Sequence, residues 1–222
     1  MQMINNFLNK IEGSYLLILN SLIMSIWIFL SYFLYIIIDP SYNILTNWIS
    51  DLAISTQGIN YFFTIGIIII GFLAFFCFIF YINFLENYIE DSIWIKPMYY
   101  HLLSLSIGFI IAGFFPLYPP NKIISVIHMT GAVLAFTGNF GFLFCGIIEW
   151  RSPKIPKALS TVSFAKIPFA IIIIVSIFSD LPAIFTDFHL SIPILYLSEW
   201  IIFILTIVWL FTHGIFTLKN SS

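Results

Sequence analysis

The sequence predicts an all-α polytopic membrane protein, with six transmembrane helices in one bundle and a short amphipathic interfacial helix after the first span. Hydrophobic residues make up 61% of the 222 residues and charged residues only 8%, whereas a soluble domain is roughly a quarter charged. Six stretches each reach the roughly 20 apolar residues that a helix needs to cross a bilayer. Because these stretches take up nearly the whole chain, we expect a single membrane domain over residues 1–222.

Charge and cysteine content exclude two classes of protein. The formal net charge is −2, and only eight residues are Lys or Arg. No basic patch is therefore available to neutralise a nucleic-acid backbone, and we expect no nucleic-acid partner. Cys77 and Cys145 lie within apolar runs, so they indicate packing residues and no disulfide framework.

The predicted spans follow one another with short connectors. They are Tyr15–Ile38, Ile59–Leu85, Pro97–Leu117, Ile123–Glu149, Leu159–Phe178 and Ile192–Leu218. The first apolar run is too long for the core of a signal peptide and is followed by Asp39 and Pro40, not by a small-residue cleavage site. We therefore expect it to remain as the first span.

The connector after the first span has an amphipathic pattern. Between Asn43 and Ile54, apolar residues recur at helical spacing, and polar residues fall on the opposite face. Pro40 suits the start of such a helix. This pattern predicts a short helix that lies in, or dips into, the outer membrane interface.

The fifth span is interrupted by Lys166 and Pro168. A proline kink, with the lysine side chain reaching toward the headgroups, would accommodate both residues in one helix. The alternative is a span that breaks into two segments.

Basic residues predict the orientation. Lys122 falls on one side of the predicted topology. Six others fall on the opposite side, namely Lys10, Lys96, Arg151, Lys154, Lys157 and Lys219. The positive-inside rule then places both termini in the cytoplasm.

Ionisable residues within spans are candidates for function, because they are expensive in the hydrocarbon region. They are His101, His128, Lys166, Glu199 and His213. At about 1.5 Å of rise per residue, His128 and Glu199 reach similar depths below the outer surface. His101 and His213 belong near the inner surface, where we interpret them as interfacial residues.

The residues on the outer side outline a polar pocket. Its members are the candidate catalytic residues Ser50, Asp51 and His128 together with Asn47, Asp180 and Glu199. A metal bound by one imidazole and two or three carboxylates is one hypothesis. Another is a metal-free site in which Asp51 or Glu199 orients His128 as a general base and Ser50 acts as nucleophile. The sequence identifies neither a metal nor a cofactor.

Purely structural interpretations compete with this pocket. A transmembrane His or Glu is often only an interhelical hydrogen-bonding group. Asp51 and Asn47 also suit the solvated face of an interfacial helix. Asp180 suits ordinary loop polarity at a helix end.

Three short motifs carry a family resemblance. Asn47 to Leu52 reads N-W-I-S-D-L, Phe115 and Pro116 end the third span, and His128 follows in the first turns of the fourth. In this order the motifs resemble the uncharacterised six-span family called domain of unknown function 998, which looks distantly similar to FRAG, DRAM and SFK-type membrane proteins. Ala53 departs from the pattern, since a glycine is common after the Ser-Asp-Leu element.

The resemblance implies a compact six-helix bundle whose polar motif residues gather on the non-cytoplasmic side. Ser50, Asp51, Pro116 and His128 match the motif positions. Links of some relatives to glycolipid remodelling or lipid organisation make membrane lipid the implied ligand class. No reaction follows from the resemblance.

Three functional hypotheses follow. The first is a lipid-binding or lipid-modifying protein that uses the outer pocket. The second is a small proton-linked transporter or channel, and the third is a non-catalytic membrane scaffold or assembly factor. The Ile-rich and Asn-rich composition suits an AT-rich prokaryotic genome, and we expect an archaeal or bacterial plasma membrane. Whether the protein is an enzyme, and which proteins it contacts, the sequence leaves open.

Overall fold

The fold of the described residues is entirely helical. A computed structural model describes residues 13–54, 58–89, 93–116, 122–180 and 193–220. Their elements are α2 (Gly13–Ile38), η1 (Ile49–Ala53), α3 (Ile59–Glu86), α4 (Ile95–Phe114), α5 (Lys122–Gly138), α6 (Phe140–Arg151), α7 (Lys157–Ala165), α8 (Ile167–Asp180) and α9 (Pro193–Asn220).

The prediction of six membrane-spanning helices is confirmed. Six stretches of the described chain are long and apolar enough to cross a membrane. Helix α5 continues into α6 and α7 into α8, so each of these pairs makes one span. No helix end differs from its predicted position by more than about three residues. That the spans form a single domain stays a prediction.

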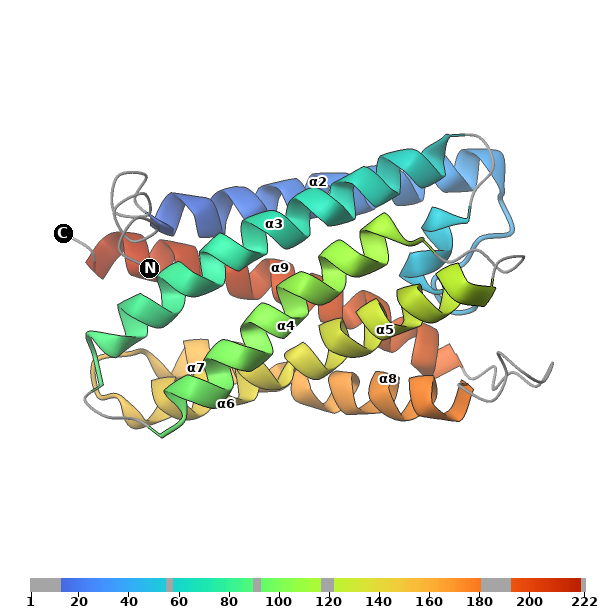
Figure 1. The fold of residues 1–222 in the computed structure, drawn as a ribbon. Helices are drawn as coiled ribbons and strands as arrows, with labels where there is room; N and C mark the ends of the chain where they lie inside the picture. The colour runs from blue at the N-terminus through green and yellow to red at the C-terminus, as the bar shows by residue number, and fades with distance from the viewer. Residues whose placement is uncertain (1–12, 55–57, 90–92, 117–121, 181–192, 221–222) are drawn as a thin grey trace.

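The helices pack into one elongated bundle with two distinct ends (Figure 1). Helix α2 begins and α9 ends at the same end, which we call the termini end, whereas η1 lies at the opposite end, the η1 end. In chain order α2, α3, α4 and α5 pack each on the next, and α9 returns to pack against α2. Helices α6 and α7 pack on each other at the termini end.

Small residues allow α4 and α5 to approach closely. A Cβ atom added to Gly108 would overlap the backbone of Ala135, and one added to Gly131 would lie 2.8 Å from the Ala112 nitrogen. Small residues at such positions permit close packing, the usual source of helix association in lipid.

The outward surface of the bundle is apolar. Large hydrophobic side chains that project from it include Ile26 (63% exposed), Ile37 (76%), Tyr61 (71%) and Val175 (60%). A soluble monomer rarely exposes so much contiguous apolar surface. The hydrocarbon core of a bilayer would cover it.

The connector after α2 differs from the predicted helix over Asn43–Ile54. Residues 44–46 form a turn, and only Ile49–Ala53 is helical, as the 3-10 helix η1. Ile49 and Leu52 are buried, because η1 packs inward against α2, α3 and α9. Its placement at a membrane interface stays a prediction.

The helix of the fifth span is interrupted at Lys166, between α7 and α8, while the two segments together still make one span. The prediction that the Lys166 side chain reaches the headgroups is wrong. The side chain is 0% exposed, and its Nζ lies 3.1 Å from the centroid of the Phe142 ring on α6. A cation–π contact inside the bundle therefore replaces the headgroup contact.

Candidate functional site

At the η1 end, two carboxylates hold the start of η1. Glu199 on α9 is 5% exposed and accepts a hydrogen bond from the backbone N–H of Ile49 at 2.6 Å. Asp51 accepts one from the N–H of Trp48 at 2.9 Å. The first N–H groups of a helix lack partners within it, so both carboxylates cap η1. Burial raises the pKa of Asp51, although its hydrogen bonds with Trp48 and Asn47 oppose this shift.

The loop that precedes η1 is fixed by polar contacts as well. The Tyr42 hydroxyl donates to the carbonyl of Trp48 at 2.7 Å. Burial and the neighbouring carboxylates of Glu199 and Asp51 raise the pKa of Tyr42. The Asn47 side chain accepts the N–H of Asn43 at 3.2 Å. Asn47 and Asp51 thus take part in holding the loop and η1 in place.

His128 is nearly buried, but its contacts are with α4. The ring Nδ1 lies 2.9 Å from the carbonyl oxygen of Phe115 and 3.3 Å from that of Ala112. A carbonyl only accepts, so Nδ1 carries the proton, and in the neutral ring Nε2 keeps its lone pair. His128 forms no hydrogen bond with Asp51 or Glu199 within the described chain.

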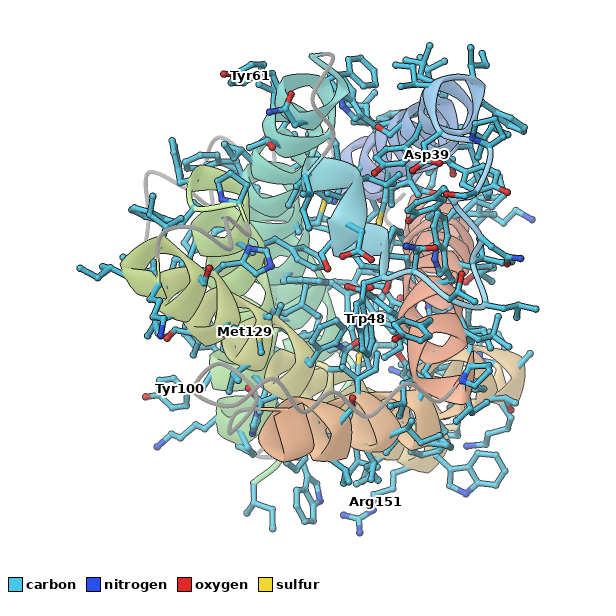
Figure 2. The ribbon with its side chains drawn as sticks, turned by 90° about the vertical axis from the view of Figure 1, so that its right-hand side faces the viewer. Asp39, Trp48, Tyr61, Tyr100, Met129 and Arg151 are labelled. Carbon is cyan, nitrogen blue, oxygen red and sulfur yellow. The ribbon has the colours of Figure 1, made fainter. Side chains whose placement is uncertain are left out.

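The structure therefore brings together some predicted pocket residues and leaves others apart. Glu199 takes hydrogen bonds from the backbone of Ile49 and Ser50 and feels the charge of Asp51. Viewed from the η1 end, Trp48 lies beside α9, whereas Met129, the neighbour of His128, lies on the α5 side (Figure 2). Asp180 ends α8, and its side chain lies outside the described part.

A second polar centre lies within the bundle toward the termini end, around the carboxylate of Glu149. This side chain is 0% exposed. Its Oε1 accepts hydrogen bonds from the Tyr81 hydroxyl at 2.8 Å, the Cys145 thiol at 3.2 Å and His213 Nε2 at 3.0 Å. Its Oε2 accepts one from the Ser163 hydroxyl at 2.9 Å. We call these five residues the Glu149 cluster; they come from α3, α6, α7 and α9.

Hydrogen-bond geometry determines where one proton of this cluster lies. His213 Nδ1 lies 2.8 Å from the carbonyl oxygen of Trp209, so Nδ1 must carry a proton. Its Nε2 faces Glu149 Oε1 at 3.0 Å, and two lone pairs would repel each other there. A proton therefore lies between Nε2 and Oε1. The hydroxyls of Tyr81 and Ser163 and the thiol of Cys145 also donate to this carboxylate, an arrangement that favours its ionised form.

Two of these side chains correct the sequence interpretation. His213, taken as an interfacial residue, is 0% exposed. The sequence places Glu149 at the end of the predicted fourth span, but α6 continues to Arg151 and the Glu149 side chain is buried inside the bundle. The i, i+4 spacing of Cys145 and Glu149 placed both on one helix face. His101 is half-buried, with Nδ1 bonded to the carbonyl of Thr137 at 3.1 Å.

Lys166 adds a buried amine near this cluster. Its Nζ lies 3.1 Å from the centroid of the Phe142 ring, and Phe142 lies one helical turn before Cys145 on α6. The Nζ has no hydrogen-bond partner among the residues the structure describes. A buried ionisable group without such a partner is costly and is typical of functional positions in membrane proteins.

One face of α9 connects the two polar centres. Glu199, Phe203, Thr206, Leu210 and His213 recur at helical spacing, and all are buried. Fourteen residues of helix set Glu199 and His213 about 21 Å apart. Near the middle, Ser21 donates to the carbonyl of Ile207 at 3.0 Å. The amide of the neighbouring Asn20 is buried and lies against the Cys77 thiol of α3.

The metal hypothesis gains no support from this geometry. Within the described ranges, no group of three or more His, Cys, Asp or Glu side chains is arranged to hold a metal ion. The carboxylates of Glu199 and Asp51 are directed at backbone N–H groups. Glu149 is likewise surrounded by hydrogen-bond donors.

Comparison with known families matches most of the chain. The profile of a family described as "Protein of unknown function (DUF998)" matches residues 22–215. The chain belongs to the DUF998 family. The matched residues of this DUF998 protein include both polar centres, from Asn47 to His213. No curated protein and no solved structure matches it significantly. The distant similarity to FRAG, DRAM and SFK-type proteins stays a prediction.

Proposed function

We propose that this DUF998 protein is a proton-linked transporter of a prokaryotic plasma membrane, with both termini in the cytoplasm. The Glu149–His213 pair is the observation that carries the proposal, because it holds a proton in a fully buried position between membrane-spanning helices. Chains of Glu, Asp and His within spans serve as proton relays in pumps and transporters.

The buried face of α9 supports this proposal. It carries Glu199 near the η1 end and His213 toward the termini end, with the buried amide of Asn20 at the level between them. Buried polar groups such as this amide are sites for water molecules, and water can carry a proton across the remaining gaps. In this mechanism Glu199 accepts a proton from the outer side, and the Glu149–His213 pair passes it to the inner side.

The distribution of basic residues supports the orientation. Lys96, Arg151, Lys154, Lys157 and Lys219 belong to segments at the termini end. Lys122 begins α5 at the η1 end. The positive-inside rule assigns the termini end to the cytoplasm.

Proton flux into proteoliposomes tests the proposal. A pH-sensitive dye inside the vesicles reports proton entry under a potassium diffusion potential, alone and with panels of amino acids, sugars and inorganic cations. We expect Glu149→Gln to slow the initial rate by about tenfold or more, which corresponds to about 1.4 kcal/mol on the barrier. Glu86→Gln, which removes an exposed carboxylate at the end of α3, is the matched control and retains the rate.

Three outcomes oppose this proposal. Proton entry no faster than in empty vesicles, under every solute, contradicts transport. A Glu149→Gln variant that is folded and as fast as the wild type removes Glu149 from the path. Loss of folding in this variant, with full flux in His213→Gln, removes the Glu149–His213 pair from the proton path and leaves Glu149 as a group that ties four helices together.

Lipid chemistry at the η1 end is the second candidate. It is favoured by His128, whose Nδ1–H is bound to the α4 carbonyls, so that Nε2 is free to act as a base in the neutral ring. In this candidate Asp51 would supply a carboxylate and Ser50 would act as the nucleophile. Mass spectrometry of lipids from the same vesicles tests it. A product lost in His128→Gln, with unchanged proton flux, supports the lipid enzyme over the transporter.

A further inference from the structure

An apolar groove lies on the outward side of α6 and α7, at the termini end. It is lined by Ile147, Trp150 and Arg151 of α6 and by Phe164 of α7, and its volume is about 350 Å³. Trp150 is 54% exposed, and Arg151 is the last residue of α6. The inward side of the same two helices carries Glu149 and Ser163.

One basic side chain, Arg151, lines this groove, and two more follow it along the chain. Arg151, Lys154 and Lys157 fall within seven residues that contain no acidic residue. Each lies near an aromatic ring, and the Lys157 ammonium also donates to the backbone carbonyls of Trp150 and Ser152. Arg151 lies over Trp94, Lys154 over Tyr88 and Lys157 over Trp150, the aromatic residue that lines the groove. In Figure 2, Arg151 projects outward from the edge of the bundle.

We propose that this groove binds one anionic phospholipid from the leaflet at the termini end. An acyl chain fits the apolar walls formed by Ile147, Trp150 and Phe164. The headgroup phosphate pairs with the Arg151 guanidinium, which suits phosphate because it donates two parallel hydrogen bonds. Lys154 and Lys157 add attraction for the anionic headgroup. A zwitterionic lipid would bring an added positive charge into this basic region and bind less tightly.

The groove is created by close packing behind it. A Cβ atom on Gly146 would lie 2.7 Å from the Phe164 ring, so only glycine lets Phe164 rest on α6 at this depth. Phe164 then forms one wall while Ile147 and Trp150 form the other. The lipid site is independent of the proposed transport, since none of the groove residues belongs to the Glu149 cluster.

Quenching of tryptophan fluorescence by brominated lipid tests this site. The full chain is reconstituted in vesicles of phosphatidylcholine with increasing brominated phosphatidylglycerol, and in the reverse series with brominated phosphatidylcholine. We expect phosphatidylglycerol to be preferred by about fivefold at Trp150, the effect of roughly one basic contact. Trp150→Phe removes the selective part of the quenching and assigns it to the groove.

Charge variants separate the groove from general attraction. Arg151→Gln should reduce the preference to about one, whereas Lys219→Gln, an equal loss of charge at the same end of the bundle, should retain it. Equal quenching by both lipids overturns the proposal, as does a preference unchanged in Arg151→Gln. In native mass spectrometry, retention of phosphatidylglycerol by the wild type supports the site. Displacement by inorganic phosphate alone shows a phosphate site without a chain and overturns the lipid assignment.

Discussion

At the residue scale, burial distinguishes polar side chains with functional potential from ordinary surface ones better than their position in the sequence does. The depth argument paired Glu199 with the η1 segment, and the structure shows the two in contact. Depth along the predicted spans does not reveal Glu149, because the partners of this residue are spread from Tyr81 to His213 and only Cys145 lies within one turn of it. Contacts between helices that are distant in sequence leave no periodic signal. Such contacts can be identified only from the way the helices pack in three dimensions.

Lys166 is a residue that we expect to lower the stability of the protein while it contributes to proton flux. Its buried ammonium has no hydrogen-bond partner in the described ranges, so Lys166→Met should raise the stability by about 1 kcal/mol or more. The same change should slow proton flux. Thermal unfolding in detergent and the flux assay measure the two effects.

Lys219→Met is the control for Lys166→Met, because Lys219 is exposed near the end of α9. It should change neither quantity appreciably. A destabilised Lys166→Met variant would mean that Lys166 has a stabilising partner and would argue against a functional charge.

At the element scale, hydropathy predicts the position of each span but not the points at which its helix is interrupted. The ends of the six helices follow from apolar runs, whose length is set by the bilayer. The break at Lys166 was one of two alternatives, and the irregularity at Asn139 between α5 and α6 was not predicted. The amphipathic connector forms a turn and a 3-10 helix, because the start of η1 is held by Glu199 of α9 as well as by its own Asp51.

The η1 element should lose stability as pH rises. Burial raises the pKa of Asp51 above its unfolded value, so the folded state binds this proton more tightly. The stabilisation is complete below the unfolded pKa, near 4, and is lost as pH rises through the raised folded pKa. Each unit of difference corresponds to about 1.4 kcal/mol. Asp51→Asn should flatten this part of the curve.

Thermal unfolding of the wild type and Asp51→Asn across this pH range measures the difference. Asp39→Asn, in the same connector, controls for the loss of one negative charge. A wild type that instead gains stability relative to Asp51→Asn as pH rises would show that the hydrogen bond from Trp48 outweighs the burial of Asp51.

At the scale of the whole molecule, composition decided the class of protein, while function required geometry. An apolar content of 61% leaves a membrane bundle as the natural solution. The two polar centres, by contrast, arise from a handful of side chains among many apolar ones. Their proposed role in transport depends on the chain crossing the membrane in a defined direction.

Cysteine accessibility tests that direction. Lys154→Cys and Lys122→Cys place thiols at opposite ends of the bundle, and both positions are exposed. The native Cys77 and Cys145 are buried and give a low background. In intact cells, a membrane-impermeant maleimide should label Lys122→Cys and not Lys154→Cys. The reverse pattern would place the termini outside the cytoplasm.

The protonation state of His213 tests the central claim most directly. In protein labelled with ¹⁵N-histidine, the His213→Gln variant assigns its signals among the four histidines. We predict that both ring nitrogens of His213 are protonated at neutral pH in the wild type, and that Nε2 loses its proton in Glu149→Gln. An unprotonated Nε2 in the wild type, with the same spectrum in Glu149→Gln, would contradict a proton held between Glu149 and His213.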